Sequence, residues 1–210
     1  GTLAVRRYGD EPPAGADGRI SVVMAAFKHA RFLERTLASL AAQTRRPDEL
    51  VVVDDGSDDG SADLVAAFAR TAPFPVVLAR QANAGADRAL NRGLALARGA
   101  TVALLNSDDG YAPARLARLS ASLAGDVALA FSDVVLIDDD DRPADGPYAR
   151  TLRQRIDEAE AGPGLLRALV RHNAATSTGN LVFRRSLLAR TGGFAPLAVC
   201  LPSNASAYVT

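Results

Sequence analysis

Short apolar runs alternate with amphipathic stretches through the first half of the chain. The apolar runs are rich in β-branched residues and predict buried strands at residues 20–24, 50–53, 76–79 and 101–105. The stretches between them carry apolar residues at helical spacing and predict helices at 30–43, 61–70 and 84–98, with a further helix from Pro113. Strands that alternate with helices of this length favour βαβ units, and so an α/β fold with a mostly parallel sheet.

The second half of the chain has a weaker pattern. Residues 127–137 predict a strand that runs into a turn, residues 180–183 predict another strand, and helices are expected at 152–161, 165–170 and 186–190. Residues 1–18 show no period and are interpreted as a loose leader or linker. We expect one domain over 19–198, followed by an atypical tail at 199–210 that is poorly ordered or irregularly packed.

Two acidic turns follow the second and fourth predicted strands. The first, DDGSDDG, covers residues 54–60, and the second, NSDD, covers 106–109. Such residues populate turns for local hydrogen-bonding reasons, and Ser57 or Ser61 could cap the helix that follows. In a parallel sheet, however, both turns lie at the carboxyl edge, where ligands bind. Adjacent carboxylates there can hold a hard divalent cation, with phosphate oxygens and water completing its shell.

Composition narrows the class of protein. The 210 residues carry 24 basic and 24 acidic side chains, which argues against a protein that coats nucleic acid. Cys200 is the single cysteine and is interpreted as an inert small hydrophobe, so no internal disulfide is expected. No apolar run approaches the length of a membrane span, and we expect a cytoplasmic protein, with attachment to the inner face of a membrane as the alternative.

Several motifs of other enzyme classes are absent from the sequence. There is no G-x-G-x-x-G after the first strand, no P-loop, no G-x-S-x-G elbow and no H-E-x-x-H. His29 and His172 are far apart in sequence, and neither is expected to be a catalytic base or a metal ligand. Gly99 is placed to end the helix predicted at 84–98.

The order of the motifs resembles that of the family 2 glycosyltransferases. The resemblance extends over residues 20–196, and the ordered set is far more specific than any single motif. It is carried by SVVMAAF at 21–27, FLERTLASL at 32–40, QT at 43–44, VVVDDGSDDGS at 51–61, NAG at 83–85, ALNRG at 89–93, LNSDD at 105–109, TGNLVFRR at 178–185 and GGF at 192–194.

The resemblance implies a GT-A fold, which is Rossmann-like, and inverting transfer of a sugar from a nucleotide-sugar donor. The donor is a UDP-sugar by default, the acceptor is a hydroxyl of a glycan or lipid-linked molecule, and the cofactor is Mg²⁺ or Mn²⁺. Polysaccharide synthesis is the implied setting. Matching positions place Asp108 and Asp109 at the metal. The implied nucleotide-sugar ligands are Ala25, Phe27, Asp54, Asp55, Asn83, Gly85, Asn106 and Asp108.

Three features depart from the family pattern. The usual Pro-x-Tyr-Asn is replaced by residues 25–28, AAFK, and the first Asp of D-x-D is replaced by Asn106, a neutral oxygen donor. No Asp or Glu occurs from residue 161 to residue 210, where the family has the acidic motif that supplies the general base. The catalytic base is therefore unassigned, a truncated or altered C-terminal end is expected, and Asp133 is an alternative source of the carboxylate.

Two other functions compete with this interpretation. A catalytically silent nucleotide-binding or interaction module on the same fold is favoured by the missing acidic motif. A nucleotidyltransferase also combines a Rossmann-like sheet with acidic metal ligands, but it would have a glycine-rich loop after the first strand, and residues 25–29 contain no glycine.

Overall fold

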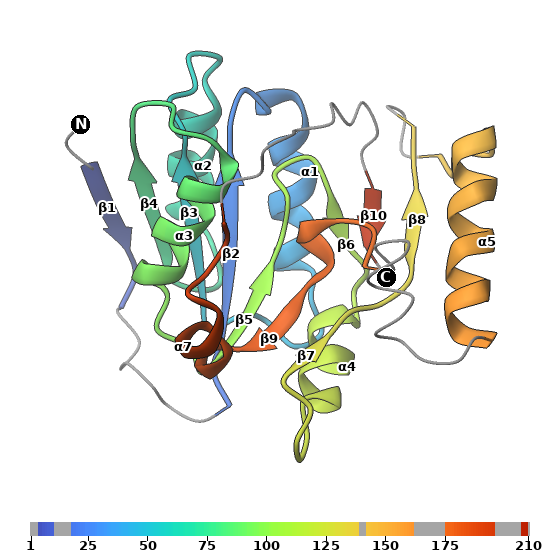
Figure 1. Cartoon of the computed structure of the whole chain (residues 1–210). Helices are drawn as coiled ribbons and strands as arrows, with labels where there is room; N and C mark the ends of the chain where they lie inside the picture. Colours follow the sequence, from blue (N-terminus) through green and yellow to red (C-terminus); the bar gives the residue numbers. More distant parts are fainter. Residues whose placement is uncertain (1–3, 11–17, 139–141, 162–174, 196–206, 210) are drawn as a thin grey trace.

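The computed structural model describes residues 4–10, 18–138, 142–161, 175–195 and 207–209. Its centre is a seven-stranded sheet in the order β1-β4-β3-β2-β5-β9-β7 (Figure 1). The four central strands are parallel, and the three outer strands run antiparallel to their neighbours. The strands are β1 (Ala4–Tyr8), β2 (Ile20–Ala26), β3 (Glu49–Asp54), β4 (Val76–Arg80), β5 (Thr101–Leu104), β7 (Leu129–Ala130) and β9 (Val182–Arg184).

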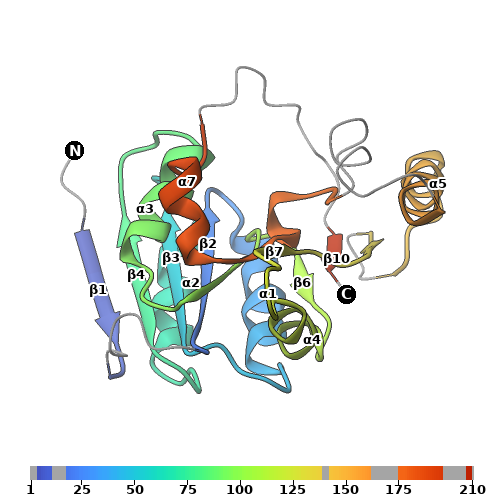
Figure 2. The same cartoon turned by 60° about the horizontal axis from the view of Figure 1, so that its bottom comes forward.

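Helices cover both faces of the central strands. Val22 and Met24 of β2 pack with α1 (Ala30–Ala41) and α2 (Ser61–Ala69), whereas Val23 points to the other face and packs with α3 (Ala86–Leu96). A short helix, α7 (Leu188–Thr191), lies beside α3 on that second face (Figure 2). Since the central strands are buried on both faces, their sequences are mostly apolar, with few polar residues. The predicted α/β fold with a mostly parallel sheet is confirmed.

A smaller three-stranded sheet lies beside the main one, in the order β6-β10-β8. The helix α5 stands next to β8 at the far side from β1 (Figure 1). No helix among the described residues is long and apolar enough to span a bilayer. The remaining elements are β6 (Gly110–Tyr111), α4 (Arg115–Ser122), β8 (Val134–Leu136), α5 (Pro147–Ala161), η1 (Thr178–Asn180), η2 (Arg185–Leu187) and β10 (Ala207–Val209).

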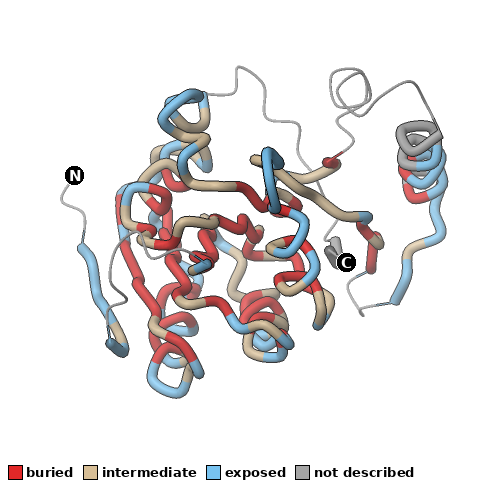
Figure 3. The backbone as a smooth tube through the Cα atoms, turned by 90° about the horizontal axis from the view of Figure 1, so that it is seen from below, coloured by how far each residue is buried: buried red, intermediate tan, exposed pale blue. Residues whose placement is uncertain are grey.

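The structure corrects the expectations for both ends of the chain. Residues 4–8 lie in the segment interpreted as a loose leader, but they form β1, which pairs with β4 along five residues. Figure 3 shows this edge strand as exposed, in contrast to the buried centre of the sheet. Residues 207–209 lie in the expected irregular tail, but they form β10 between β6 and β8. Backbone pairing stabilises both segments, although neither has an apolar period.

Other differences concern boundaries and caps. Residues 127–137 form two short strands instead of one, and residues 178–180 form a 3₁₀ turn before β9. The helix predicted at 165–170 and residue Cys200 lie outside the described residues. Neither Ser57 nor Ser61 is the N-cap of α2, because Gly60 occupies that position. The helix α3 ends at Leu96, before Gly99, where a Cβ atom would come within 2.7 Å of the backbone nitrogen of Ser21.

Candidate nucleotide site at the carboxyl edge of the sheet

The carboxyl edge of the sheet has a point where the strand order changes direction. From β2, the chain adds β3 and β4 on one side and then crosses to place β5 on the other side. Ligands in open α/β sheets bind in the crevice at such a point. The predicted site residues lie at or just after the carboxyl ends of β2, β3, β4 and β5, so the topology brings them to one edge of the sheet.

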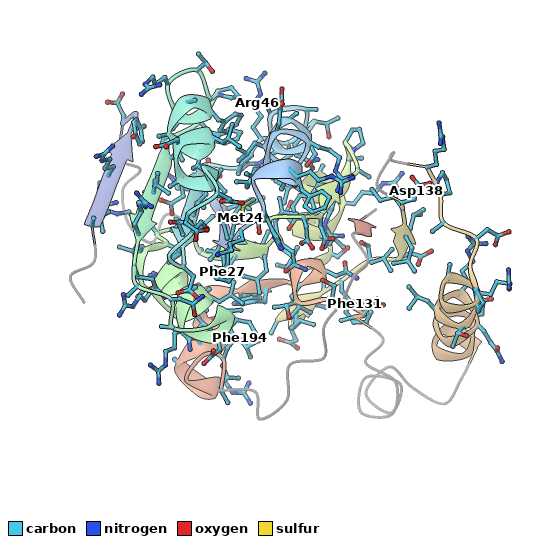
Figure 4. The ribbon with its side chains drawn as sticks, turned by 90° about the horizontal axis from the view of Figure 1, so that it is seen from above. Met24, Phe27, Arg46, Phe131, Asp138 and Phe194 are labelled. Carbon is cyan, nitrogen blue, oxygen red and sulfur yellow. The ribbon has the colours of Figure 1, made fainter. Side chains whose placement is uncertain are left out.

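The segment after β2 presents an exposed aromatic ring. Ala25 is half-buried, whereas the side chain of Phe27, labelled in Figure 4, is 40% exposed. The Nζ atom of Lys28 lies 5.6 Å from the centre of the Phe27 ring and 2.9 Å from a carboxylate oxygen of Asp58. Lys28 has a φ of 57°, a conformation uncommon outside glycine, and its backbone N–H donates to Ser57 Oγ at 3.0 Å.

The two aspartates at the end of β3, Asp54 in the strand and Asp55 just after it, are buried and accept hydrogen bonds from neighbouring residues. Asp54 accepts a hydrogen bond from Arg80 Nε at 3.1 Å. Asp55 is 3% exposed, and its carboxylate accepts three hydrogen bonds, from Gln81 Nε2 at 2.6 Å, Ala84 N at 2.8 Å and Gly85 N at 2.9 Å. Asp55 therefore fixes the loop that carries the exposed side chain of Asn83 and the half-buried Gly85.

The acidic turn after β5 is held by α1. Arg35 Nη2 donates to the carbonyl oxygen of Asp108 at 2.6 Å. The Thr36 Oγ1 hydroxyl lies 2.6 Å from the carbonyl oxygen of Asp109 and 3.2 Å from that of Ser107. These contacts use the backbone carbonyl groups of the turn and fix its position against α1.

The two carboxylates of this turn face different surroundings. Asp109 is 2% exposed, and its Oδ2 accepts a hydrogen bond from Asn106 Nδ2 at 2.9 Å. The side chain of Asp108 is 19% exposed. Of the two predicted metal ligands, Asp108 is therefore the more exposed and Asp109 is buried.

His29 lies beside the acidic turn after β5, which was not expected from the sequence. Its Nδ1 lies 2.7 Å from Ser107 Oγ and 4.0 Å from Asp108 Oδ1. His29 is the residue before α1 and comes two positions after the exposed Phe27. That placement at the end of a central strand was the signal that sequence reasoning could have used, since strand ends are where this fold gathers its ligands.

The residues present fit a divalent cation that is held jointly by the protein and by the phosphate groups of a bound nucleotide. Among the described residues, no group of three or more His, Cys, Asp or Glu side chains forms a complete metal cage. Mg²⁺ is commonly bound by one or two carboxylates together with substrate phosphates and water. One accessible carboxylate, Asp108, beside the site edge matches that pattern.

Buried polar contacts also fix the turn at Ser177–Asn180, which packs against Asn106 of the acidic turn after β5. Arg115 is 1% exposed, and its Nη2 donates to both the backbone oxygen and Oδ1 of Asn180 at 2.9 Å. Its guanidinium lies 4.7 Å from the centre of the Tyr111 ring. Burial lowers the pKa of Arg115, with Tyr111 and Asp109 opposing that shift, and burial raises the pKa of Tyr111.

Known proteins share both the sequence pattern and the fold. The family 2 glycosyl transferase model matches residues 21–192. An uncharacterized glycosyltransferase of Nostoc sp. is 37% identical over 128 residues, which are 60% of this chain and 40% of that protein. The succinoglycan biosynthesis protein ExoO of Rhizobium meliloti is 40% identical over 124 residues, which are 57% of this chain and 34% of that protein.

Two solved structures show the same architecture. A mannosyltransferase of Pyrobaculum calidifontis in complex with GDP-Man and Mn²⁺ is 26% identical, with a TM-score of 0.59, over 90% of this chain and 50% of that one. TarS 1–349 of Staphylococcus aureus in complex with UDP is 20% identical, with a TM-score of 0.55, over 83% and 49% of the two chains. The GT-A fold expected from the resemblance is confirmed.

The matched region accounts for part of each relative. The chain spans about half or less of the length of these proteins. The family itself is nevertheless established, because the match runs through the strands and turns that build the site. This chain belongs to glycosyl transferase family 2.

Proposed function

We propose that the protein transfers a sugar from a nucleotide-sugar donor to a hydroxyl of a glycan or lipid-linked acceptor, with inversion. The observation that carries this proposal is that Phe27, Asp55 and Asp108 follow the carboxyl ends of three neighbouring strands, β2, β3 and β5, at the switch point. UDP is the default nucleotide, and Mg²⁺ or Mn²⁺ is the proposed cofactor. The relative named for succinoglycan biosynthesis supports polysaccharide synthesis as the setting.

Each group at the edge has a role in donor binding. The exposed ring of Phe27 offers a surface on which a nucleobase can stack. Asp55 keeps the loop of Asn83 and Gly85 in place, so those residues can face the nucleotide. Asp108 would hold the divalent cation, which neutralises charge on the leaving diphosphate when bound. We propose a cytoplasmic location, with attachment to the inner face of a membrane as the alternative.

The acceptor half of the site lacks an assigned base. A positioned base contributes roughly 10²–10⁴-fold to such a reaction, and no carboxylate occurs between residues 161 and 210. The alternative carboxylate, Asp133, accepts a hydrogen bond from the backbone N–H of Val134 at 2.7 Å. We therefore expect this chain to bind nucleotide and to transfer sugar slowly.

A silent nucleotide-binding module is the second candidate function. The absence of acidic residues from 161 to 210 favours it. Sugar transfer at ordinary turnover would exclude it, while nucleotide binding with no transfer to any acceptor would favour it. The nucleotidyltransferase alternative has no observation in its favour here.

Calorimetric titration with UDP and GDP, in Mn²⁺ or in EDTA, tests the proposal. We expect tighter binding with Mn²⁺, because a diphosphate and the carboxylate of Asp108 repel each other without a cation between them. The variant Asp108→Asn should lose most of this Mn²⁺ dependence. Asp58→Asn is the matched control, since Asp58 is exposed and pairs with Lys28 on the same edge. Equal affinity in Mn²⁺ and EDTA for the unmodified protein would contradict metal-dependent binding.

A further inference from the structure

We propose that Asn106 is a positioning residue, whose amide nitrogen joins the acidic turn after β5 to the Ser177–Asn180 turn. The family pattern places an aspartate at this point of the D-x-D motif. In the structure, the side chain at position 106 donates hydrogen bonds. An aspartate at this position would therefore weaken the nucleotide site, although it would restore the family's motif. The nucleotide part of this inference rests on the proposed function.

The amide nitrogen of Asn106 has two hydrogens and two acceptors. Nδ2 donates to Asp109 Oδ2 at 2.9 Å and to Ser177 Oγ at 2.7 Å. An ionised carboxylate only accepts hydrogen bonds, so the nitrogen end of the amide must face Asp109. Ser177 Oγ also accepts the backbone N–H of Gly179 at 3.1 Å, as the cap of η1. One side chain thus links segments 71 residues apart.

Packing against Gly179 independently fixes the place of Asn106. A Cβ atom on Gly179 would lie 2.8 Å from the backbone nitrogen of Asn106 and 3.0 Å from its Cγ. The close approach therefore requires glycine at that position. Behind it, Asn180 is fully buried and accepts hydrogen bonds from Arg115. Asn106 is joined to a turn that is itself held in place, which makes the link suitable for setting the position of the acidic turn.

Aspartate has the shape of asparagine but no hydrogen to donate when ionised. Its carboxylate would face that of Asp109 at the present hydrogen-bond distance of 2.9 Å. Two like charges at that separation repel, and burial of Asp109 increases the effect. Either the turn opens, or one of the two carboxylates takes up a proton that the pair shares, and both outcomes change the position or the charge of the turn that carries Asp108.

A double-mutant cycle tests the link without any nucleotide. Urea midpoints are measured for the unmodified protein, Asn106→Ala, Ser177→Ala and the double variant. We expect the double variant to lose less than the two single losses added together, because each single change removes the same hydrogen bond. Ser186→Ala, an exposed serine on η2, is the matched control and should not couple to Asn106→Ala. Additive midpoint losses for Asn106 and Ser177 would overturn the link.

The affinity for UDP tests the consequence for the site. We expect Asn106→Asp to bind UDP in Mn²⁺ about tenfold more weakly than the unmodified protein, with a smaller ratio of affinities between Mn²⁺ and EDTA. Affinity in Mn²⁺ that equals or exceeds that of the unmodified protein would overturn the inference. Circular dichroism of each variant reports whether it folds.

Two outcomes separate this inference from the proposed function. If the unmodified protein binds neither UDP nor GDP, the proposed function fails, while the double-mutant cycle still decides the link. If Asn106→Asp does not fold, Ser177→Ala supplies the nucleotide measurement, since it removes one acceptor and leaves the charge unchanged. Weaker Mn²⁺-dependent binding by Ser177→Ala, with normal binding by Ser186→Ala, supports the inference, and unchanged binding contradicts it.

Discussion

Replacing Asp55 by asparagine should destabilise the protein even in the absence of nucleotide. The Asp55 carboxylate is buried and accepts three hydrogen bonds, two of them on Oδ1 and one on Oδ2. An asparagine keeps one oxygen, so its NH₂ group must face at least one N–H donor of the loop. Hydrogen bonds to a charged group contribute about 1.5–3 kcal/mol each, and a buried donor without a partner costs about 1–3 kcal/mol.

These magnitudes give a loss of about 3 kcal/mol in the free energy of unfolding for Asp55→Asn. With an m-value of about 2–3 kcal/mol/M, the urea midpoint should fall by roughly 1 M. Asp58→Asn in the same acidic turn is the control, and its exposed ion pair with Lys28 should change stability by less than about 1 kcal/mol. A normal midpoint for Asp55→Asn, with reduced UDP affinity, would show that Asp55 serves the ligand and not the loop.

Three further changes probe other parts of the structure. Gly99→Ala should lower stability by about 1–3 kcal/mol, because the new Cβ would meet backbone atoms of Ser21 and Arg19; Gly146→Ala, with open space around it, is the control in the same urea assay. Asp59→Ala should be less stable than the unmodified protein at neutral pH, and the free energies of unfolding of the two proteins should become equal in acid. Burial raises the pKa of Asp59, but hydrogen bonds from Ser61 and Ala30 lower it below 3.8, so its contribution is present above that pH and is lost as pH falls through the folded-state pKa. Unfolding measured from pH 6 to pH 2 checks this, and a constant difference would contradict it. Arg115→Lys should cost about 3 kcal/mol, since an ammonium cannot reproduce the planar contacts to Asn180 and Ser132; a normal thermal midpoint would count against this.

The central sheet could be predicted because burial on both faces leaves a mark on the sequence. The strands β2, β3, β4 and β5 each contain a run of at least three consecutive apolar residues, with polar residues at or near their ends, and each strand lies within one or two residues of its predicted range. The strand β1 could not be predicted in this way. It contains Arg6 and Arg7 and lies at the edge, where neighbouring backbone groups decide pairing and exposed side chains need no apolar period.

The structural roles of Gly99 and Gly179 could not be predicted from the local sequence. Gly99 follows a helix, as a C-terminal cap does, and the local pattern predicts that role. The structure gives it another, since the backbone of Ser21, 78 positions earlier, approaches too closely for a side chain. The same holds for Gly179 beside Asn106. Close approaches between distant segments are set by packing, and a single sequence does not contain them.

For the site residues, too, local features could be predicted from the sequence and features set by packing could not. The acidic turns were predictable because turn chemistry and strand ends are local features. The difference in exposure between Asp108 and Asp109 could not be predicted, because the two residues are adjacent in sequence and differ only in what surrounds them in the fold. Asp109 faces the buried side with Asn106, while Asp108 stays accessible beside His29. The motif therefore predicts where a cation would bind, and the fold makes Asp108 the more exposed of the two carboxylates proposed to hold it.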